Sequence, residues 1–305
     1  MTLSPLALFV YNRPKELEIT LKYLKKNLLI KQTKIYVFSD GPKNEFEDKI
    51  KVSKVRILIE NSKLNIKKKR YFKMNRGLKK NILGGLNTIF KTNTKVIVLE
   101  DDIITSKYFL NFMNESLEYI KNNNKVWHVG AWNYPIKINN NDKNKIILNS
   151  QMHCWGWGTH KKNWKKINLN SNSLIKKFNN ELINVFTWNN KLNNWSQLIR
   201  NHNGQLKSWA IFWYTSIFLN KAMSLTPLVS YTRNIGFSQT STNTKKKFKQ
   251  IIKLNNSKIK YFINNNLNQY YLSKIDQYLS GELLSNNKKN NQLGSLVKNL
   301  FKKFL

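Results

Sequence analysis

Lys95-Val96-Ile97-Val98-Leu99-Glu100-Asp101-Asp102 is the stretch that decides the fold of this chain. A continuous apolar run of this length predicts a buried strand of a parallel sheet. The run ends in three adjacent carboxylates, although the chain has only 16 acidic residues against 53 Lys and Arg. Three adjacent like charges repel one another, so the triplet has little structural reason to occur unless it has a function. At the exit of a buried strand it could hold Mg2+ or Mn2+, which prefer hard oxygen ligands. The alternative is a solvated acidic turn.

The sequence before this run predicts an alternation of strands and helices. Strands are expected at 6–11, 35–38 and 70–72, and helices at 14–24, 52–61 and 77–90. Such an alternation is typical of an open α/β sheet.

Polar residues follow three of these strands. They are Asn12-Arg13, Asp40 and the acidic triplet. Ligands of open α/β sheets bind beyond the carboxyl ends of the strands, so we expect these residues to converge at one edge.

The second half of the chain has a different pattern. Helices are expected at 108–120 and about 208–220, strands at 126–130 and 225–230, and a mobile loop at 139–145. We therefore divide the chain into a first half of the main domain (1–105), a second half (106–245) and a basic helical tail (246–305). Residues 293–305 place apolar side chains on one helical face and lysines opposite. Such a helix can lie on an anionic membrane surface, or dock on the protein's own core.

Composition limits the class of protein. At 305 residues with 41% hydrophobic content, the chain can form one large domain. A single cysteine, Cys154, excludes an intramolecular disulfide. No secretory signal or spanning apolar segment is recognisable, so we expect a cytoplasmic protein, either free or peripheral on the inner leaflet of the plasma membrane. The net charge of +37 favours an anionic partner, although an AT-rich coding sequence also enriches Lys, Asn and Ile.

Seven motifs follow one another between residues 5 and 240. They are Phe9-Val10-Tyr11-Asn12-Arg13-Pro14, Ser39-Asp40-Gly41, Asn75-Arg76-Gly77 with Asn81 and Gly84, Val98-Leu99-Glu100-Asp101-Asp102, Trp155-Gly156-Trp157-Gly158-Thr159, Ser208-Trp209-Ala210-Ile211 and Asn234-Ile235-Gly236-Phe237. In this order they resemble the GT-A nucleotide-sugar glycosyltransferases, and among them bacterial family 2-like sugar transferases related to N-acetylglucosaminyltransferase I. The resemblance implies a GT-A (Rossmann-like) domain with an open mixed sheet flanked by helices. It also implies an enzyme that moves a sugar from a nucleotide-diphosphate donor, with UDP expected, to a glycan or lipid-linked acceptor in surface polysaccharide synthesis.

The resemblance assigns a role to each matching residue. Binding of the nucleotide sugar is expected from Asn12, Arg13, Asp40, Asn75, Gly77, Asn81, Glu100 and Asp101. Asp102 is expected to ligate Mn2+ or Mg2+, and Trp155, Gly156, Trp157 and Trp209 to contact the acceptor or its sugar. Plainer roles are also open: a turn for Asp40, a helix N-terminus for Asn75 to Asn81, and the core for the tryptophans, above all Trp209 and Trp213.

Two departures leave the catalytic residue unassigned. Relatives carry an acid just before the Ser-Trp pair, where this chain has Lys207, and a lysine ammonium is not a base unless its pKa is strongly depressed. Relatives also carry a histidine after the Asn-Ile-Gly segment, and residues 238–243 contain none. Weak substitutes are Glu181 or His202 as the base and His153 or His160 at the site, although each histidine is more commonly structural.

Two other functions compete with this enzyme. The missing acid and histidine favour a nucleotide-sugar-binding pseudoenzyme or partner subunit. The charge and the interleaved aromatics favour a nucleic-acid-binding protein, but no helix-turn-helix, RNA-recognition or zinc motif is recognisable, so nucleic acid is not expected as a partner.

Overall fold

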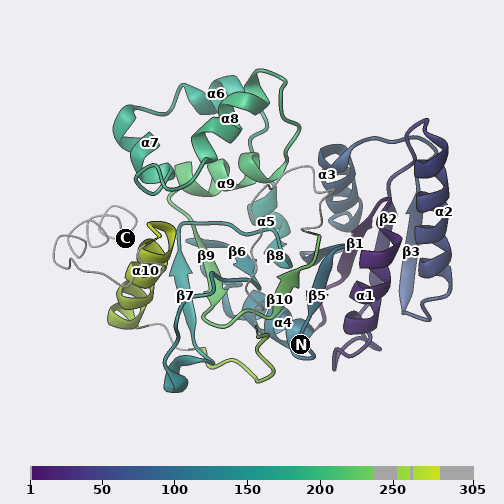
Figure 1. Ribbon diagram of the computed structural model, residues 1–305. Helices are drawn as coiled ribbons and strands as arrows, with labels where there is room; N and C mark the ends of the chain where they lie inside the picture. The colour runs from purple at the N-terminus through teal and green to yellow at the C-terminus, as the bar shows by residue number, and fades with distance from the viewer. Residues whose placement is uncertain (1, 237–252, 262–263, 282–305) are drawn as a thin grey trace.

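Four parallel strands form one half of the main sheet in the computed structural model, which describes residues 2–236, 253–261 and 264–281 (Figure 1). They are β1 (Leu6–Val10), β2 (Ile35–Ser39), β3 (Ile66–Tyr71) and β4 (Lys95–Glu100), in the order β3-β2-β1-β4. The register pairs Leu6 with Ile35 on one side and with Ile97 on the other. Every residue of β1 is buried, because helices cover both faces of the sheet, and this explains its continuous apolar run.

The other half of the sheet is mixed. It consists of β8 (Trp157–His160), β6 (Val126–Gly130), β9 (Met223–Pro227) and β7 (Ile146–Asn149), in that order after β4. β8 runs antiparallel to both β4 and β6, and β6 runs parallel to β9. A separate ribbon pairs β5 (Ile103–Thr105) with β10 (Thr232–Asn234). The predicted α/β class with an open mixed sheet flanked by helices is confirmed.

Helices pack on both faces of this sheet. One face is covered by α1 (Pro14–Leu24), α2 (Phe46–Glu60) and α4 (Phe109–Tyr119), and the other by α3 (Leu78–Ile89), α5 (Lys161–Trp164) and α9 (Ala210–Leu219). Three further helices gather on the far side of α9, namely α6 (Ser171–Ile175), α7 (Asn180–Phe186) and α8 (Asn194–His202) (Figure 1). None of the described helices is both long and apolar enough to cross a membrane.

The last described helix, α10 (Asn265–Leu279), belongs to the main body. Its Tyr271 and Leu272 are buried, and the side chain of Asn268 exchanges two hydrogen bonds with the backbone of Leu148 in β7. The expected loop at 139–145 is held by the same helix, because Asp142 accepts a 2.7 Å hydrogen bond from the Tyr271 hydroxyl. Residues 265–279 therefore pack against the main body, and the division of the chain into two halves and a tail stays a prediction. The amphipathic segment 293–305 lies outside the described residues.

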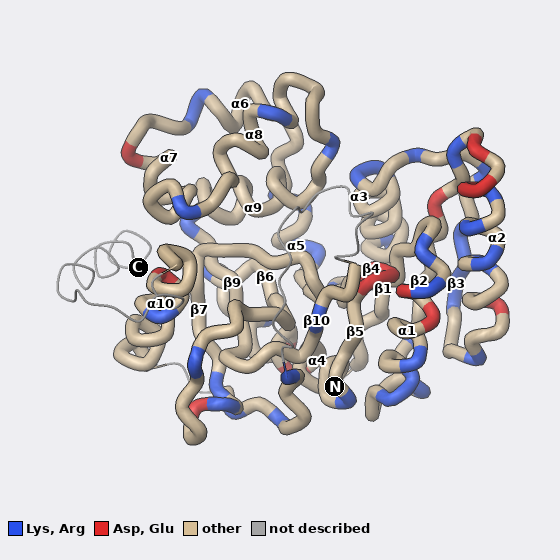
Figure 2. Tube along the Cα trace, in the orientation of Figure 1, with Lys and Arg blue, Asp and Glu red and all other residues tan. Residues whose placement is uncertain are grey.

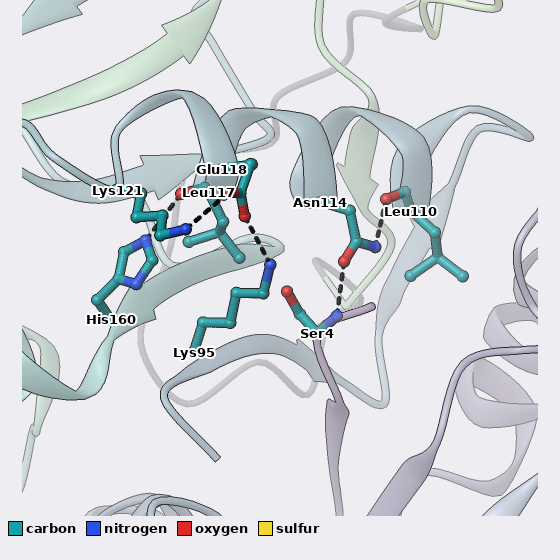
Figure 3. A network of polar contacts seen from close by, with 8 residues as sticks. All are labelled: Ser4, Lys95, Leu110, Asn114, Leu117, Glu118, Lys121 and His160. Carbon is teal, nitrogen blue, oxygen red and sulfur yellow. Dashed lines mark hydrogen bonds and ion pairs between the residues drawn. The ribbon is translucent and has the colours of Figure 1, made fainter. Parts of the chain in front are cut away.

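A polar network fixes α4 at the edge of the sheet where β4 begins (Figure 3). Lys95 pairs with Glu118 at 3.2 Å, and the backbone amide of Ser4 donates to Asn114 at 2.6 Å. His160 contacts the Leu117 carbonyl through Nε2 at 2.8 Å. Because Lys95 and Glu100 are the two ends of β4, this network lies at the edge opposite the acidic triplet.

Candidate functional site

The carboxyl ends of β1 and β4 are joined by side chains that the sequence predicts to be site residues. The Arg13 guanidinium donates to the Asp102 carboxylate, and the two form an ion pair. Asp101 turns the other way and accepts a 2.8 Å hydrogen bond from the backbone amide of Tyr11. Figure 2 shows acidic residues where β4 ends and others on α1 and α2, in a chain in which Lys and Arg predominate. The predicted convergence at one edge is confirmed for these residues.

The triplet is short of positive charge. Burial, and then the charges of Asp102 and Asp101, raise the pKa of Glu100 to about 8. Burial, and then the charge of Asp102, raise the pKa of Asp101 to about 7, and burial raises that of Asp102. Burial lowers the pKa of Arg13, but the three carboxylates outweigh this and raise it. The arrangement therefore favours the arrival of a further cation.

The donor atoms at this edge fit Mg2+ or Mn2+. Asp102 presents a carboxylate beside Arg13, and carboxylate oxygens are the ligands that both ions take. Within residues 2–236, 253–261 and 264–281, no group of three or more His, Cys, Asp or Glu side chains is arranged to hold an ion. A metal held by Asp102 would therefore take most of its ligands from water and from a bound anion such as a diphosphate.

Gly236 packs against the Arg13–Asp102 pair, and the sequence had placed it in a motif without giving it a role. A Cβ at this position would lie 2.1 Å from Asp102 Oδ2 and 2.9 Å from the Arg13 guanidinium. The preceding residue, Ile235, donates its backbone amide to the Asp102 carbonyl at 2.8 Å. A larger residue here would displace the Asp102 or Arg13 side chain, which gives the Asn234-Ile235-Gly236 motif a steric cause. The 238–243 segment, where a histidine was missing, lies outside the described residues.

Asp40 anchors two loops at the end of β2. Its carboxylate accepts 2.9 Å hydrogen bonds from the backbone amides of Gly41, Arg76 and Gly77. These bonds fix the loop that leads into α3, where Gly77 has a φ of +78° that favours glycine. The turn alternative for Asp40 is thus correct, and contact with a nucleotide base stays a prediction.

Asn75 and Asn81 lie beside this anchor. Asn75 donates its side-chain amide to the Gly41 carbonyl at 3.0 Å, which holds the two loops together. Asn81 donates at 3.4 Å to the Phe38 carbonyl, and its own Oδ1 is buried without a partner among the described residues.

Asp48 is a second anchor that the sequence reasoning missed. It lies in the first turn of α2 and accepts 2.6 Å hydrogen bonds from the Tyr11 hydroxyl, the Asn12 side-chain amide and the Lys43 backbone amide. Burial raises the pKa of Asp48, but these hydrogen bonds outweigh burial and hold it below its usual value. Asp48 therefore positions Asn12 and the loop that carries Arg13.

The tryptophan predictions need correction. Trp157 is fully buried and stacks on Trp209, itself 2% exposed, with ring centroids 5.0 Å apart. Neither offers a ring face to a sugar, so both are core residues because the sheet and α9 close over them. Gly156 has a φ of +79°, and a Cβ there would lie 2.7 Å from a methyl group of Thr232. Trp155 is half-buried at the carboxyl edge and remains a candidate.

The candidate bases are scattered. Glu181 and His202 are exposed on α7 and α8, in the helical group beyond α9, and Lys207 is exposed between α8 and α9. His160 lies at the opposite edge, in the network of Figure 3. His153 precedes β8, which is antiparallel to β4, so it emerges where β4 ends. It is the one of these four candidates that the topology brings to the carboxyl edge.

No protein-family model matches the chain, and no curated protein matches it. Its structure is similar to the mannosyltransferase PcManGT from Pyrobaculum calidifontis, solved with GDP-Man and Mn2+ (15% identity, TM-score 0.36, 53% of this chain and 46% of that chain). It is also similar to S. aureus TarS 1–349 (12% identity, TM-score 0.40, 98% of this chain and 70% of that chain). A third similar structure is GalNAc-T7 with UDP, GalNAc and Mn2+ (11% identity, TM-score 0.43, 74% of this chain and 42% of that chain). The matched part of this chain spans less than half the length of PcManGT and of GalNAc-T7.

Proposed function

We propose that this chain is a metal-dependent GT-A glycosyltransferase that transfers a sugar from a nucleotide-diphosphate donor, with UDP expected, to a glycan or lipid-linked acceptor. The observation that carries the proposal is the Arg13–Asp102 pair at the joint carboxyl edge of β1 and β4. It combines a guanidinium suited to a diphosphate with a carboxylate suited to a cation. The order of the seven motifs supports the same assignment.

Each residue of the edge then has a task. Arg13 binds the diphosphate, and Asp102 holds Mn2+ or Mg2+. When bound, the metal supplies Lewis-acid stabilisation of the charge on the departing nucleoside diphosphate. Asp48 holds Asn12 in place, and Asp40 holds the loop with Gly77, so that both loops reach the donor in a fixed geometry.

The test measures thermal stabilisation by UDP, GDP and CMP sugars, each with and without Mn2+. A UDP sugar with Mn2+ should raise the melting temperature, and Asp102→Asn should remove the metal-dependent part of this shift. Asp142→Asn is the matched control, since Asp142, like Asp102, is a buried aspartate paired with a basic side chain, in this case Lys145, but lies beside α10. Binding that does not depend on the metal, or an unchanged shift in Asp102→Asn, would contradict the mechanism.

A second candidate is a pseudoenzyme that binds the nucleotide sugar without turnover. Lys207 favours it, because it is an exposed lysine where relatives carry an acid. Hydrolysis of the donor by water, or transfer to any acceptor, would exclude it.

The same proposal includes a place in the cell. A cytoplasmic enzyme held on the inner leaflet would meet lipid-linked acceptors of surface polysaccharide, and the basic segment 293–305 could provide the contact. Sedimentation with anionic and neutral vesicles, for the full chain and for a chain that ends at residue 281, measures this contribution. Equal binding of both chains would argue against the segment as an anchor.

A further inference from the structure

Besides Trp157 Nε1, which belongs to the core, two buried N–H groups near the carboxyl edge have no hydrogen-bond acceptor among the described residues. They are the indole Nε1 of Trp132 and the side-chain Nε2 of Gln151. The two residues are only 4% and 5% exposed. Buried donors are nearly always paired, because leaving one unpaired costs free energy. Two such donors within one group of contacting side chains are suited to a ligand that offers oxygens to both.

Both donors belong to one group of side chains, which we call the aromatic-amide cluster: Trp132, Tyr134, Gln151, His153 and Trp155. The Trp132 ring lies edge-on to Trp155 and His153, with centroids 4.6 Å apart in both pairs. The Tyr134 hydroxyl donates at 3.0 Å to Gln151 Oε1. This bond occupies the oxygen of the amide and leaves its NH2 group to face another acceptor.

The cluster lies beside the acidic triplet. Residues 151–155 lead into β8 and therefore lie where β4 ends. The Trp155 carbonyl accepts a 2.6 Å hydrogen bond from Thr232, which pairs with Thr105, shortly after Asp102 in the chain. Cys154, between His153 and Trp155, has its pKa raised by burial and then by the charges of Glu100 and Asp102.

The chemistry of the cluster is that of sugar recognition. The half-buried rings of Tyr134 and Trp155 suit the apolar face of a pyranose, and the two N–H groups require oxygens as acceptors. No member is charged at neutral pH, since burial lowers the pKa of His153 to about 3. An uncharged sugar therefore fits this group better than a phosphate does.

We propose that the aromatic-amide cluster binds the sugar unit of the acceptor, with Trp132 Nε1 and Gln151 Nε2 donating to its oxygens. This inference rests on the proposed function and replaces Trp157 and Trp209 as the acceptor platform. Both donor atoms are buried in the ligand-free chain, so binding requires neighbouring side chains to move aside.

The first experiment follows the indole N–H resonance of Trp132 by NMR, identified by its loss in Trp132→Phe. Methyl hexosides and N-acetylhexosaminides, added at millimolar concentration with UDP and Mn2+ present, should move this resonance. Trp188→Phe is the matched control, because Trp188 Nε1 is also buried and unpaired but lies in a different core cluster. Its resonance should stay in place. If no glycoside moves the Trp132 resonance, the proposal is wrong.

The second experiment separates this site from the donor site. Trp132→Phe and Gln151→Met should raise the KM for an acceptor glycoside about tenfold, the effect of losing one hydrogen bond of about 1.4 kcal/mol. Hydrolysis of the donor by water should stay within about twofold, since it needs no acceptor. Unchanged KM values in both variants would mean that the donors are satisfied by water. Failure of the wild-type chain to bind any nucleotide with Mn2+ would instead overturn the proposed function.

Discussion

The hydroxyl of Tyr11 donates a 2.6 Å hydrogen bond to Asp48, so the residue that follows β1 is held by the first turn of α2. The same carboxylate accepts a hydrogen bond from the side-chain amide of Asn12, the residue before Arg13. A buried aspartate outside the acidic triplet thus sets the geometry of the loop that faces Asp102.

Asp48→Asn should therefore destabilise the protein and weaken donor binding together. The substitution keeps the shape but turns an amide NH2 toward groups that donate, which costs about 1–3 kcal/mol. Urea unfolding measures the loss of stability, and the thermal shift with UDP and Mn2+ measures binding. Glu47→Gln is the control: it removes an exposed i,i+4 pair with Lys51 and should cost at most about 0.5 kcal/mol. Equal effects of the two variants would contradict the anchoring role.

The stability of the protein should depend on pH through the titration of Asp48. The pKa of Asp48 is held below its ordinary value of 3.8, so its hydrogen bonds stabilise the protein above that pH, and the contribution is lost as the pH falls through the folded-state pKa. The difference in unfolding free energy between wild type and Asp48→Asn should shrink as the pH is lowered from 6 to below the ordinary pKa. A constant difference over this range would mean that Asp48 does not titrate with folding.

Gly236→Ala should disrupt the Arg13–Asp102 pair while leaving the fold in place. The added methyl group would lie 2.1 Å from an Asp102 oxygen, so one of the two charged side chains must move. We expect the affinity for UDP with Mn2+ to fall about tenfold or more, the equivalent of about 1.4 kcal/mol. Calorimetric titration measures it.

Gly84→Ala is the control for this substitution. Gly84 lies within α3, and the atom nearest to an added Cβ is 4.0 Å away. Alanine should stabilise the helix by about 0.5–1 kcal/mol and leave binding unchanged. If Gly236→Ala binds donor as well as Gly84→Ala does, the close packing on Asp102 has no functional weight.

Asp40→Asn should loosen the start of α3. Three backbone amides donate to this carboxylate, and an amide side chain cannot accept all of them in the same geometry. Hydrogen exchange at the amides of Arg76 and Gly77 should become at least about tenfold faster, as the loss of one such bond implies. Unchanged exchange would show that the loop does not depend on Asp40, and any loss of donor binding would then reflect direct contact.

Trp157→Phe should affect stability and not acceptor binding. The buried indole stacks between Trp209 and His128, so its truncation leaves space in the core and costs about 2 kcal/mol. The KM for an acceptor should remain that of the wild type. A raised KM without loss of stability would restore Trp157 as a sugar-binding residue.

The predicted elements differ from the observed ones mainly where the pattern is short. The helix expected at 52–61 begins earlier, at Phe46. The prediction missed its first turn because that turn is acidic and has no buried apolar residue, only the buried Asp48. The strands β7 and β8 were not predicted, because sequence runs of only four residues cannot be distinguished from loops. The helices α6 and α7 are short and capped by Asn170 and Asn179, and their apolar faces are satisfied only by packing near α9.

The sequence by itself determined the parallel strands β1, β2 and β4 and the edge at which the polar residues that follow them meet. Short apolar runs that alternate with amphipathic helices predict buried parallel strands, and parallel strands bring their carboxyl ends to one edge, so Arg13 and Asp102 were expected near one another, as the ion pair shows. Only the tertiary structure decided which side chains face that edge. The closure of α9 over Trp157 and Trp209, the contact of Gly236 with Asp102, and the contact of Trp132 with Trp155 all join segments distant in the chain. Periodicity within one segment carries no information about such contacts, because packing between segments creates them.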